Sequence, residues 1–200
     1  MISISDMGVT FITPAGDVKA AQNINVTFQD QKITGIIGES GSGKSVLGMS
    51  ILRLLPENAR IEGTCMYQDR DLYHVSEKEI QKLRGREIGL IPQNPQASLN
   101  PMRKLSSQLR EALLVHRLES RSGADKRVET LMRSFGFEDP GEYWNKYPFQ
   151  MSGGMNQRMV SILGLACAPK WLIADEPTKG LDAVMRRQVY QVLRRSFADC

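Results

Sequence analysis

The feature that most constrains the fold of this chain is a glycine-rich run, Gly38-Glu-Ser-Gly-Ser-Gly-Lys-Ser45, which fits the pattern G-x-x-x-x-G-K-[ST] at every specified position. Glycines let successive backbone amides turn inward around an anion, and the following helix directs the positive end of its dipole at the same point. Lys44 adds a charge for the β- and γ-phosphates, and the Ser45 hydroxyl is a ligand for Mg²⁺. The run therefore predicts a loop that holds a nucleoside triphosphate with its magnesium.

The segments on either side of this loop support the prediction. The apolar residues 33–37 indicate a buried strand that ends directly in the loop, and residues 45–55 indicate a helix that stops before Pro56. A glycine-rich turn without a ligand is the alternative, but it would need neither neighbour. A strand, a phosphate-binding loop and a helix in this order are typical of an α/β fold.

Strand patterns fill most of the first half of the chain, and helical patterns fill most of the second. Alternating or apolar runs predict strands at residues 2–5, 24–28, 61–67, 88–91 and 171–174. Helices are expected at residues 76–84, where Ser76 and Glu79 match a capping box, and at 105–115, 125–135 and 184–197, with Gly136 as a C-terminal cap. The sequence predicts an α/β core with antiparallel strands near its start. It further predicts a helical insertion over about 94–165, which leaves about 1–93 and 166–200 as the core.

Composition places the 200 residues among soluble globular chains. The net charge is +4, with 41% hydrophobic and 24% charged residues, which argues against disorder. No apolar run reaches the roughly 18 residues that a membrane span needs, and the first residues lack the basic and apolar parts of a secretory signal. Cys65, Cys167 and Cys200 are widely spaced and form neither a disulfide framework nor a metal motif, which favours a reducing cytosol.

Two acids follow the strand predicted at residues 171–174. The carboxyl ends of strands are where α/β sheets place their ligands, so Asp175 is expected to hold Mg²⁺ and Glu176 to act as a general base toward water. An Asp-Glu pair alone is common at a solvated strand end. The pair indicates a catalytic role here because a phosphate-binding loop lies upstream in the same chain.

Two longer segments extend this picture to a family. Tyr147-Pro-Phe-Gln-Met-Ser-Gly-Gly-Met-Asn-Gln-Arg158 and Asp175-Glu-Pro-Thr-Lys-Gly-Leu-Asp182 resemble the signature, Walker B and D-loop of ABC transporter ATPases, and the resemblance runs from about residue 2 to the end. It implies a single ABC ATPase domain over residues 1–200, with a P-loop NTPase core, an antiparallel β subdomain and a helical subdomain. It also implies that the helix after Ser152, which Ser152 is expected to cap, contacts the γ-phosphate bound by a second such subunit, so that two chains enclose two ATP molecules.

The resemblance also implies roles for individual residues. Gln93 follows the strand at 88–91, where the family has its Q-loop glutamine, and Phe11 stands where an aromatic ring stacks on adenine, although a phenylalanine there is as easily part of the core. The catalytic residues would be Lys44, Gln93 and Glu176, and the metal ligands Ser45, Gln93 and Asp175. The nucleotide-binding residues would be Phe11, Gly38, Glu39, Ser40, Gly41, Ser42, Gly43, Lys44, Ser45, Val46, Ser152, Gly153, Gly154 and Asp182.

Within the family, the chain is similar to the peptide/opine/nickel uptake group of importers. The loop with Val46, the run Gln93-Asn-Pro-Gln-Ala-Ser-Leu-Asn-Pro101, and Met151 and Met155 around the signature carry this similarity. The methionines resemble nickel and metallophore importers most, and dipeptide and oligopeptide importers are close. The implied partners are a second ABC ATPase, identical or not, two membrane permeases and, indirectly, an extracytoplasmic binding protein. No nucleic acid is expected, and the expected location is the cytoplasmic face of the cell membrane.

Some positions depart from the family pattern. Met151 and Met155 replace the common Leu and Gln, and Lys179-Gly180 replaces a pair of small residues, a change that could alter communication between two sites. The family's switch histidine comes after Walker B, whereas His74 and His116 precede it and are expected on the surface. A C-terminal part is therefore expected to be missing. The alternatives are a soluble ABC ATPase that acts on DNA or ribosomes and a regulatory subunit that binds nucleotide without turnover. A small-molecule kinase would not need Ser152-Gly-Gly154.

Overall fold

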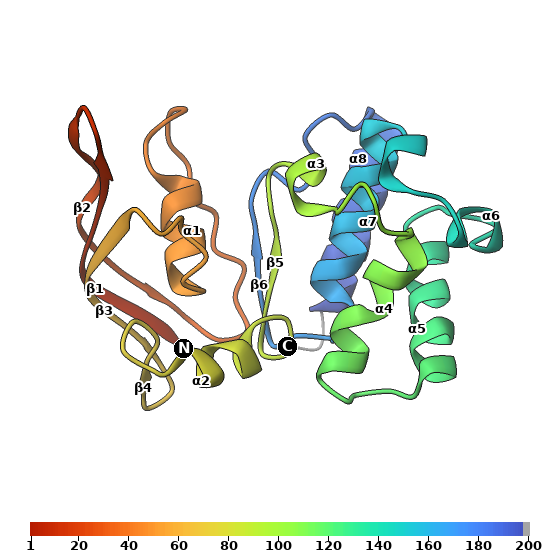
Figure 1. Cartoon of the computed structure of the whole chain (residues 1–200), viewed down its shortest axis with the longest axis horizontal. Helices are drawn as coiled ribbons and strands as arrows, with labels where there is room; N and C mark the ends of the chain where they lie inside the picture. Colours follow the sequence, from red (N-terminus) through yellow and green to blue (C-terminus); the bar gives the residue numbers. More distant parts are fainter. Residues whose placement is uncertain (198–200) are drawn as a thin grey trace. The chain divides into compact units, whose positions relative to one another are not determined.

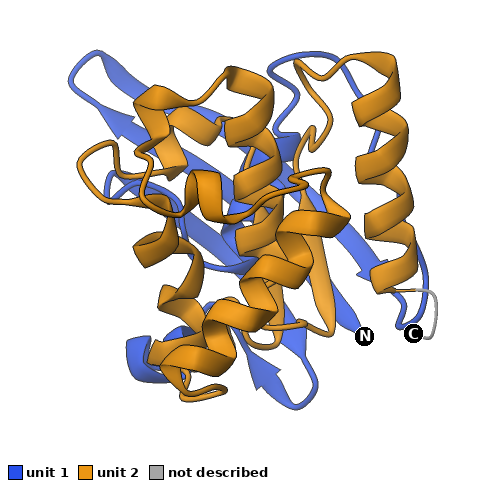
Figure 2. Cartoon of the chain, turned by 90° about the vertical axis from the view of Figure 1, so that its right-hand side faces the viewer, with its two compact units in different colours: residues 1–81, 200 blue, residues 82–199 orange. Residues whose placement is uncertain are grey.

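A computed structural model describes residues 1–197 of the chain and divides it into two compact units. Unit 1 comprises residues 1–81, and unit 2 begins at Lys82; the two are coloured separately in Figure 2. Unit 1 is built mainly from antiparallel strands, and unit 2 holds a parallel strand pair and most of the helices. The chain therefore has the mixed α/β content that its sequence predicts.

Unit 1 contains a four-stranded antiparallel sheet in the order β2-β1-β3-β4 (Figure 1). Its strands are β1 (Ile2–Thr13), β2 (Gly16–Phe28), β3 (Ala59–Tyr67) and β4 (Arg70–Asp71). The first two form a hairpin much longer than the strands predicted at 2–5 and 24–28.

The hairpin is longer than predicted because bulges interrupt the two-residue alternation of buried and exposed side chains. Ile2 and Ile4 are buried on one face, and an irregularity at Asp6, with φ 51, shifts the register so that Met7 and Val9 are buried beyond it. On the neighbouring strand β3, Gly63 has φ 87, and a Cβ there would lie 2.5 Å from the backbone oxygens of Ser5 and Asp6. Only glycine fits this close approach.

The prediction of a strand at residues 33–37 is wrong, because these residues form no strand. Ile33 and Ile37 are 81% and 98% exposed, and no pairing includes residues 31–40 of the described chain. The run has the composition of a buried strand, but no strand of the described residues pairs with it. After it, α1 (Lys44–Ile51) starts where the predicted helix does and ends earlier than residue 55.

Helix α2 (Glu77–Leu83) leads from unit 1 into unit 2 and opens with the predicted capping box. The Glu79 amide donates to Ser76 Oγ at 3.3 Å, and the Ser76 amide donates to Glu79 Oε2 at 3.0 Å. The parallel pair β5 (Ile88–Ile91) and β6 (Trp171–Ala174) follows the predicted bounds, with Ile88 opposite Trp171.

The helices of unit 2 enclose one apolar core. They are α3 (Pro95–Ser98), α4 (Leu105–Val115), α5 (Arg121–Ser134), α6 (Gly141–Trp144), α7 (Gly153–Leu165) and α8 (Ala183–Ser196), with a 3₁₀ turn at Pro148–Gln150. Gly136, at φ 80, follows the end of α5 as predicted. Fully buried core side chains include Leu109, Leu113, Val128, Met132, Phe135 and Ile162.

Helix α7 packs closely on β5 because glycines face each other across the contact. A Cβ on Gly164 would lie 2.7 Å from Ile91 Cγ1 and 2.9 Å from the Leu90 carbonyl oxygen, and a Cβ on Gly89 would collide with the carbonyl of Gly164. This close packing holds the C-terminal end of α7 against β5.

The histidines and cysteines largely follow expectation. His74 is exposed. His116 is partly exposed, and its Nε2 hydrogen-bonds to the Arg84 carbonyl at 2.9 Å. Cys65 and Cys167 are buried free thiols, and Cys200 lies outside the described residues.

Candidate functional site

The glycine-rich loop of unit 1 is exposed and needs glycine at specific positions. Gly43 precedes α1 with φ 89, and a Cβ there would lie 2.8 Å from the Ala20 carbonyl oxygen of β2. Gly41 has φ 80 but open space around it. Both backbone conformations are strained for other residues. The loop therefore holds a shape that presents backbone amides at the start of α1.

Lys44 folds back over this loop. Its ammonium donates to the carbonyl oxygens of Gly38 at 2.8 Å and Glu39 at 2.6 Å, and to Ser42 Oγ at 3.3 Å. Three oxygen acceptors hold the charge over the turn, where phosphate oxygens would replace them. Ser45 and Val46 follow in the first turn of α1, as the loop pattern requires.

The two acids of unit 2 follow β6 as predicted. The Asp175 amide donates to the Ile91 carbonyl at 2.9 Å, which extends the pairing of β6 with β5 by one residue. Glu176 has φ 46, a left-handed conformation that is uncommon for a glutamate. Its Oε2 lies 2.8 Å from Lys179 Nζ. The turn thus brings the predicted general base against a lysine.

The N-terminus of α7 has the predicted capping geometry. Ser152 is the N-cap, and its Oγ accepts from the Met155 amide at 3.3 Å. A Cβ on Gly153 would meet nothing within 4 Å, so the first turn is open. Asp182 caps α8 by accepting from the Val184 and Met185 amides, each at 3.0 Å. A contact of Asp182 with nucleotide stays a prediction beside this capping role.

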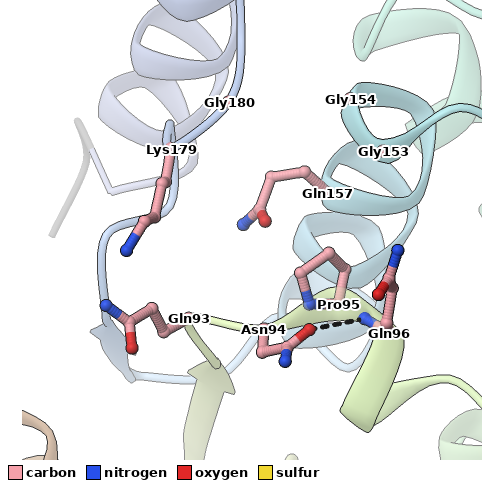
Figure 3. Close-up of a pocket in the computed structure, with 9 residues that line it drawn as sticks. All are labelled: Gln93, Asn94, Pro95, Gln96, Gly153, Gly154, Gln157, Lys179 and Gly180. Carbon is pink, nitrogen blue, oxygen red and sulfur yellow. Dashed lines mark hydrogen bonds between the residues drawn. The ribbon is translucent and has the colours of Figure 1, made fainter.

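A cavity of about 370 Å³ brings several of these residues together within unit 2 (Figure 3). Its lining combines the segment after β5, the first turn of α7 and the turn after β6, namely Gln93, Asn94, Pro95, Gln96, Gly153, Gly154, Gln157, Lys179 and Gly180. Gln93 therefore lines the same cavity as Gly153 and Gly154, whereas its predicted role at the metal and the attacking water stays a prediction. Asn94 caps the short helix α3 by accepting from the Gln96 amide at 3.0 Å, which shapes one wall.

Gln157 and Lys179 are two cavity residues that the sequence-based site omits. Gln157 is only 2% exposed, and its Nε2 has no hydrogen-bond partner among the described residues, although its side chain points into the cavity in Figure 3. It lies four residues after Gly153, on the same helix face, which is the one signal in the sequence that could have indicated it. In the sequence, the only signal for Lys179 was that it departs from the family pattern at this position.

The predicted site residues are divided between the two units. Residues 38–46 and Phe11 lie in unit 1, and unit 2 contains Gln93, Ser152, Asp175, Glu176 and Asp182. Phe11 is half-buried in β1, opposite Val18 and Ala59. Its stacking on adenine stays a prediction.

The predicted metal ligands are a hydroxyl, an amide oxygen and a carboxylate. Such hard oxygen donors, completed by phosphate oxygens and water, suit Mg²⁺. No cluster of three or more His, Cys, Asp or Glu side chains that could hold a metal occurs among residues 1–197. A magnesium ion held mainly by nucleotide needs no such cluster, so the donor set fits.

Comparison with known proteins gives consistent matches. The family model described as "ABC transporter" matches residues 21–179. The oligopeptide transport ATP-binding protein OppD of Bacillus subtilis is 38% identical over 97% of this chain and 55% of its own length. The dipeptide transport ATP-binding protein DppD of the same organism is 39% identical over 97% of this chain and 58% of its own length. The chain thus spans somewhat more than half the length of these relatives.

A solved structure shares the fold. It is described as a dimeric structure of a post-hydrolysis state of the ATP-binding cassette MJ0796 bound to ADP and Pi. The match has a TM-score of 0.87 and 25% sequence identity, and it covers 100% of this chain and 84% of that one. Within residues 1–197, none of the helices has the length and hydropathy to cross a bilayer.

Proposed function

Because the chain belongs to the ABC transporter family of ATP-binding proteins, we propose that it binds MgATP in the loop at residues 38–45 and hydrolyses it with a second such subunit. The observation that carries this proposal is the loop itself. Gly43 is constrained to glycine by Ala20, and the Lys44 ammonium rests on the oxygens of Gly38 and Glu39. These are the groups that a triphosphate requires in a cradle of backbone amides.

Binding begins with an exchange of partners at Lys44. Its ammonium leaves the loop oxygens for the β- and γ-phosphates, while the amides of the loop and of the first turn of α1 donate to the phosphate chain. Ser45, Gln93 and Asp175 would supply oxygen ligands for Mg²⁺, which would neutralise charge on the phosphate oxygens. The residues of this chain thus hold the nucleotide in place and orient its terminal phosphate.

Glu176 supplies the base for hydrolysis. Its carboxylate accepts a proton from a water molecule as that water attacks the γ-phosphorus, and the bond to the ADP oxygen breaks, giving ADP and inorganic phosphate. Gln93 orients the water. The open first turn of α7 after Ser152 donates amides to the γ-phosphate held by a second subunit, so turnover depends on dimer formation.

The proposed role is that of an importer's motor subunit for dipeptides or oligopeptides. The support comes from relatives named oligopeptide and dipeptide transport ATP-binding proteins at 38% and 39% identity. The partners would be two membrane permeases and, through them, an extracytoplasmic binding protein, with this subunit at the cytoplasmic face. Nickel or a metal chelate is the alternative cargo, based on Met151 and Met155. Co-purification with permeases supports the role, and co-purification with nucleic acid would contradict it.

The catalytic proposal is tested by Glu176→Gln in the full-length subunit with its partners. Loss of a general base lowers turnover by about 10²- to 10⁴-fold, while MgATP affinity stays near that of the unchanged protein. The substituted protein is expected to elute as a dimer when ATP is present. Undiminished phosphate release would remove Glu176 from the mechanism.

A further inference from the structure

The cavity at the start of α7 is lined by hydrogen-bond donors and positive charge. The open first turn of α7 presents the positive end of a 13-residue helix, and Lys179 brings an ammonium to the wall. Gln157 is 2% exposed, and its Nε2 faces the cavity with no hydrogen-bond partner among the described residues (Figure 3). A buried donor without an acceptor is costly, so the cavity is complementary to an oxyanion.

The lysine of this cavity also holds the proposed general base. Lys179 Nζ lies 2.8 Å from Glu176 Oε2, and the two side chains are 60% and 43% exposed. An ion pair three residues apart and this open to solvent adds little to stability, because water screens it and two flexible side chains must be ordered. The ammonium can therefore change partner at small cost.

We propose that Lys179 is a positioning residue that alternates between two anions, the Glu176 carboxylate and a phosphate group that enters the cavity at the N-terminus of α7. With the cavity empty, Lys179 holds Glu176 in the ion pair. A phosphate group accepts from Gln157 Nε2 and from the first-turn amides of α7, and it draws the ammonium away. The carboxylate then loses this ion pair, which changes how it is held toward water. This inference rests on the proposed function, since the carboxylate that Lys179 pairs with is the proposed base.

The test measures phosphate binding rather than hydrolysis. Inorganic phosphate is titrated into the full chain, and the side-chain amide resonances of Gln157 are followed by NMR, because they report on this cavity alone. All variants carry Lys44→Ala, which weakens binding at the glycine-rich loop. The set comprises Lys179→Ser, Lys179→Arg, Glu176→Gln and the double variant Lys179→Ser/Glu176→Gln. The matched control is Lys170→Ser, whose lysine forms a similar exposed ion pair with Glu87 at 3.0 Å.

The expected pattern is a coupling between two side chains. Lys179→Ser weakens phosphate binding about tenfold, Lys179→Arg keeps it within about twofold, and Lys170→Ser has no effect. Glu176→Gln tightens binding about fivefold, because the ammonium no longer has a competing carboxylate. In the Lys179→Ser background, Glu176→Gln has no further effect. An equal gain in both backgrounds would overturn the proposal, because Glu176 would then repel the anion directly.

A second arm identifies the source of the phosphate group. A labelled Lys44→Ala chain is mixed with an unlabelled, unaltered chain loaded with a non-hydrolysable ATP analogue. A shift of the Gln157 resonances in the mixture assigns the phosphate to nucleotide on another copy, and a shift with inorganic phosphate alone assigns it to a free ion. No shift in either arm would overturn the proposal. If the unaltered chain bound no nucleotide, the proposed function would fail while the titration with free phosphate could still succeed.

Discussion

Replacing Gly43 with alanine tests the shape of the phosphate-binding loop, and Gly41→Ala is its matched control. Both glycines have a positive φ, 89 and 80, that costs an alanine about 1 kcal/mol. Position 41 has open space around it, so Gly41→Ala has only this conformational cost. At position 43 the new Cβ would also lie 2.8 Å from the Ala20 carbonyl oxygen, and such overpacking adds about 1–3 kcal/mol. Gly43→Ala should therefore destabilise unit 1 by about 2 kcal/mol more than Gly41→Ala.

The measurement combines urea unfolding with hydrogen exchange. Urea unfolding gives the free energy of unfolding of each nucleotide-free variant, and exchange of the amides in β2 shows whether the loss falls on the strand that carries Ala20. MgATP affinity should fall further for Gly43→Ala than for Gly41→Ala, because the first amides of α1 would move away from the phosphates. Equal destabilisation by the two substitutions would refute the reasoning, since it would mean that position 43 does not contact β2.

Two further predictions concern the buried groups around Asp71. Burial, followed by the nearby Asp71 carboxylate, raises the pKa of Cys65 to about 12, so an alkylating reagent at pH 8 should label Cys65 only in unfolded protein; rapid labelling of the folded chain would contradict its burial. Partial burial raises the pKa of Asp71, but hydrogen bonds from the Cys65 amide, His74 and the Tyr73 amide outweigh it and hold that pKa below its ordinary value. The stability from Asp71 is thus present above about pH 4 and is lost as the pH falls through the lowered pKa. Asp71→Asn should remove this pH-dependent stability, and an unchanged acid limb in urea unfolding would contradict it.

Local sequence patterns predicted the elements whose signals lie within a few residues. The capping box at Ser76 and Glu79, the caps at Ser152 and Gly136, and the strands β5 and β6 all depend on neighbours in the chain. The glycine-rich loop belongs with them, because its pattern fixes both its turn and the helix after it. Such signals are read directly from residue type and spacing.

Features that depend on distant contacts escaped prediction. The irregularity at Asp6 is accommodated by Gly63 on another strand, so the length of the β1–β2 hairpin was not visible in the alternation of residues 2–5. Residues 33–37 have strand composition, but forming a strand needs a partner that composition does not supply. Gln157 and Lys179 became site residues only because α7 and the turn after β6 line the same cavity.

Calorimetric titration of MgATP into the folded chain tests the central proposal most directly, with Lys44→Ala as the matched variant. Backbone amides and the Lys44 ammonium together should give a measurable affinity, and removing the ammonium should lower it at least tenfold, a change of about 1.4 kcal/mol or more. No binding heat with the unaltered chain, or the same affinity in Lys44→Ala, would contradict a nucleotide site at residues 38–45.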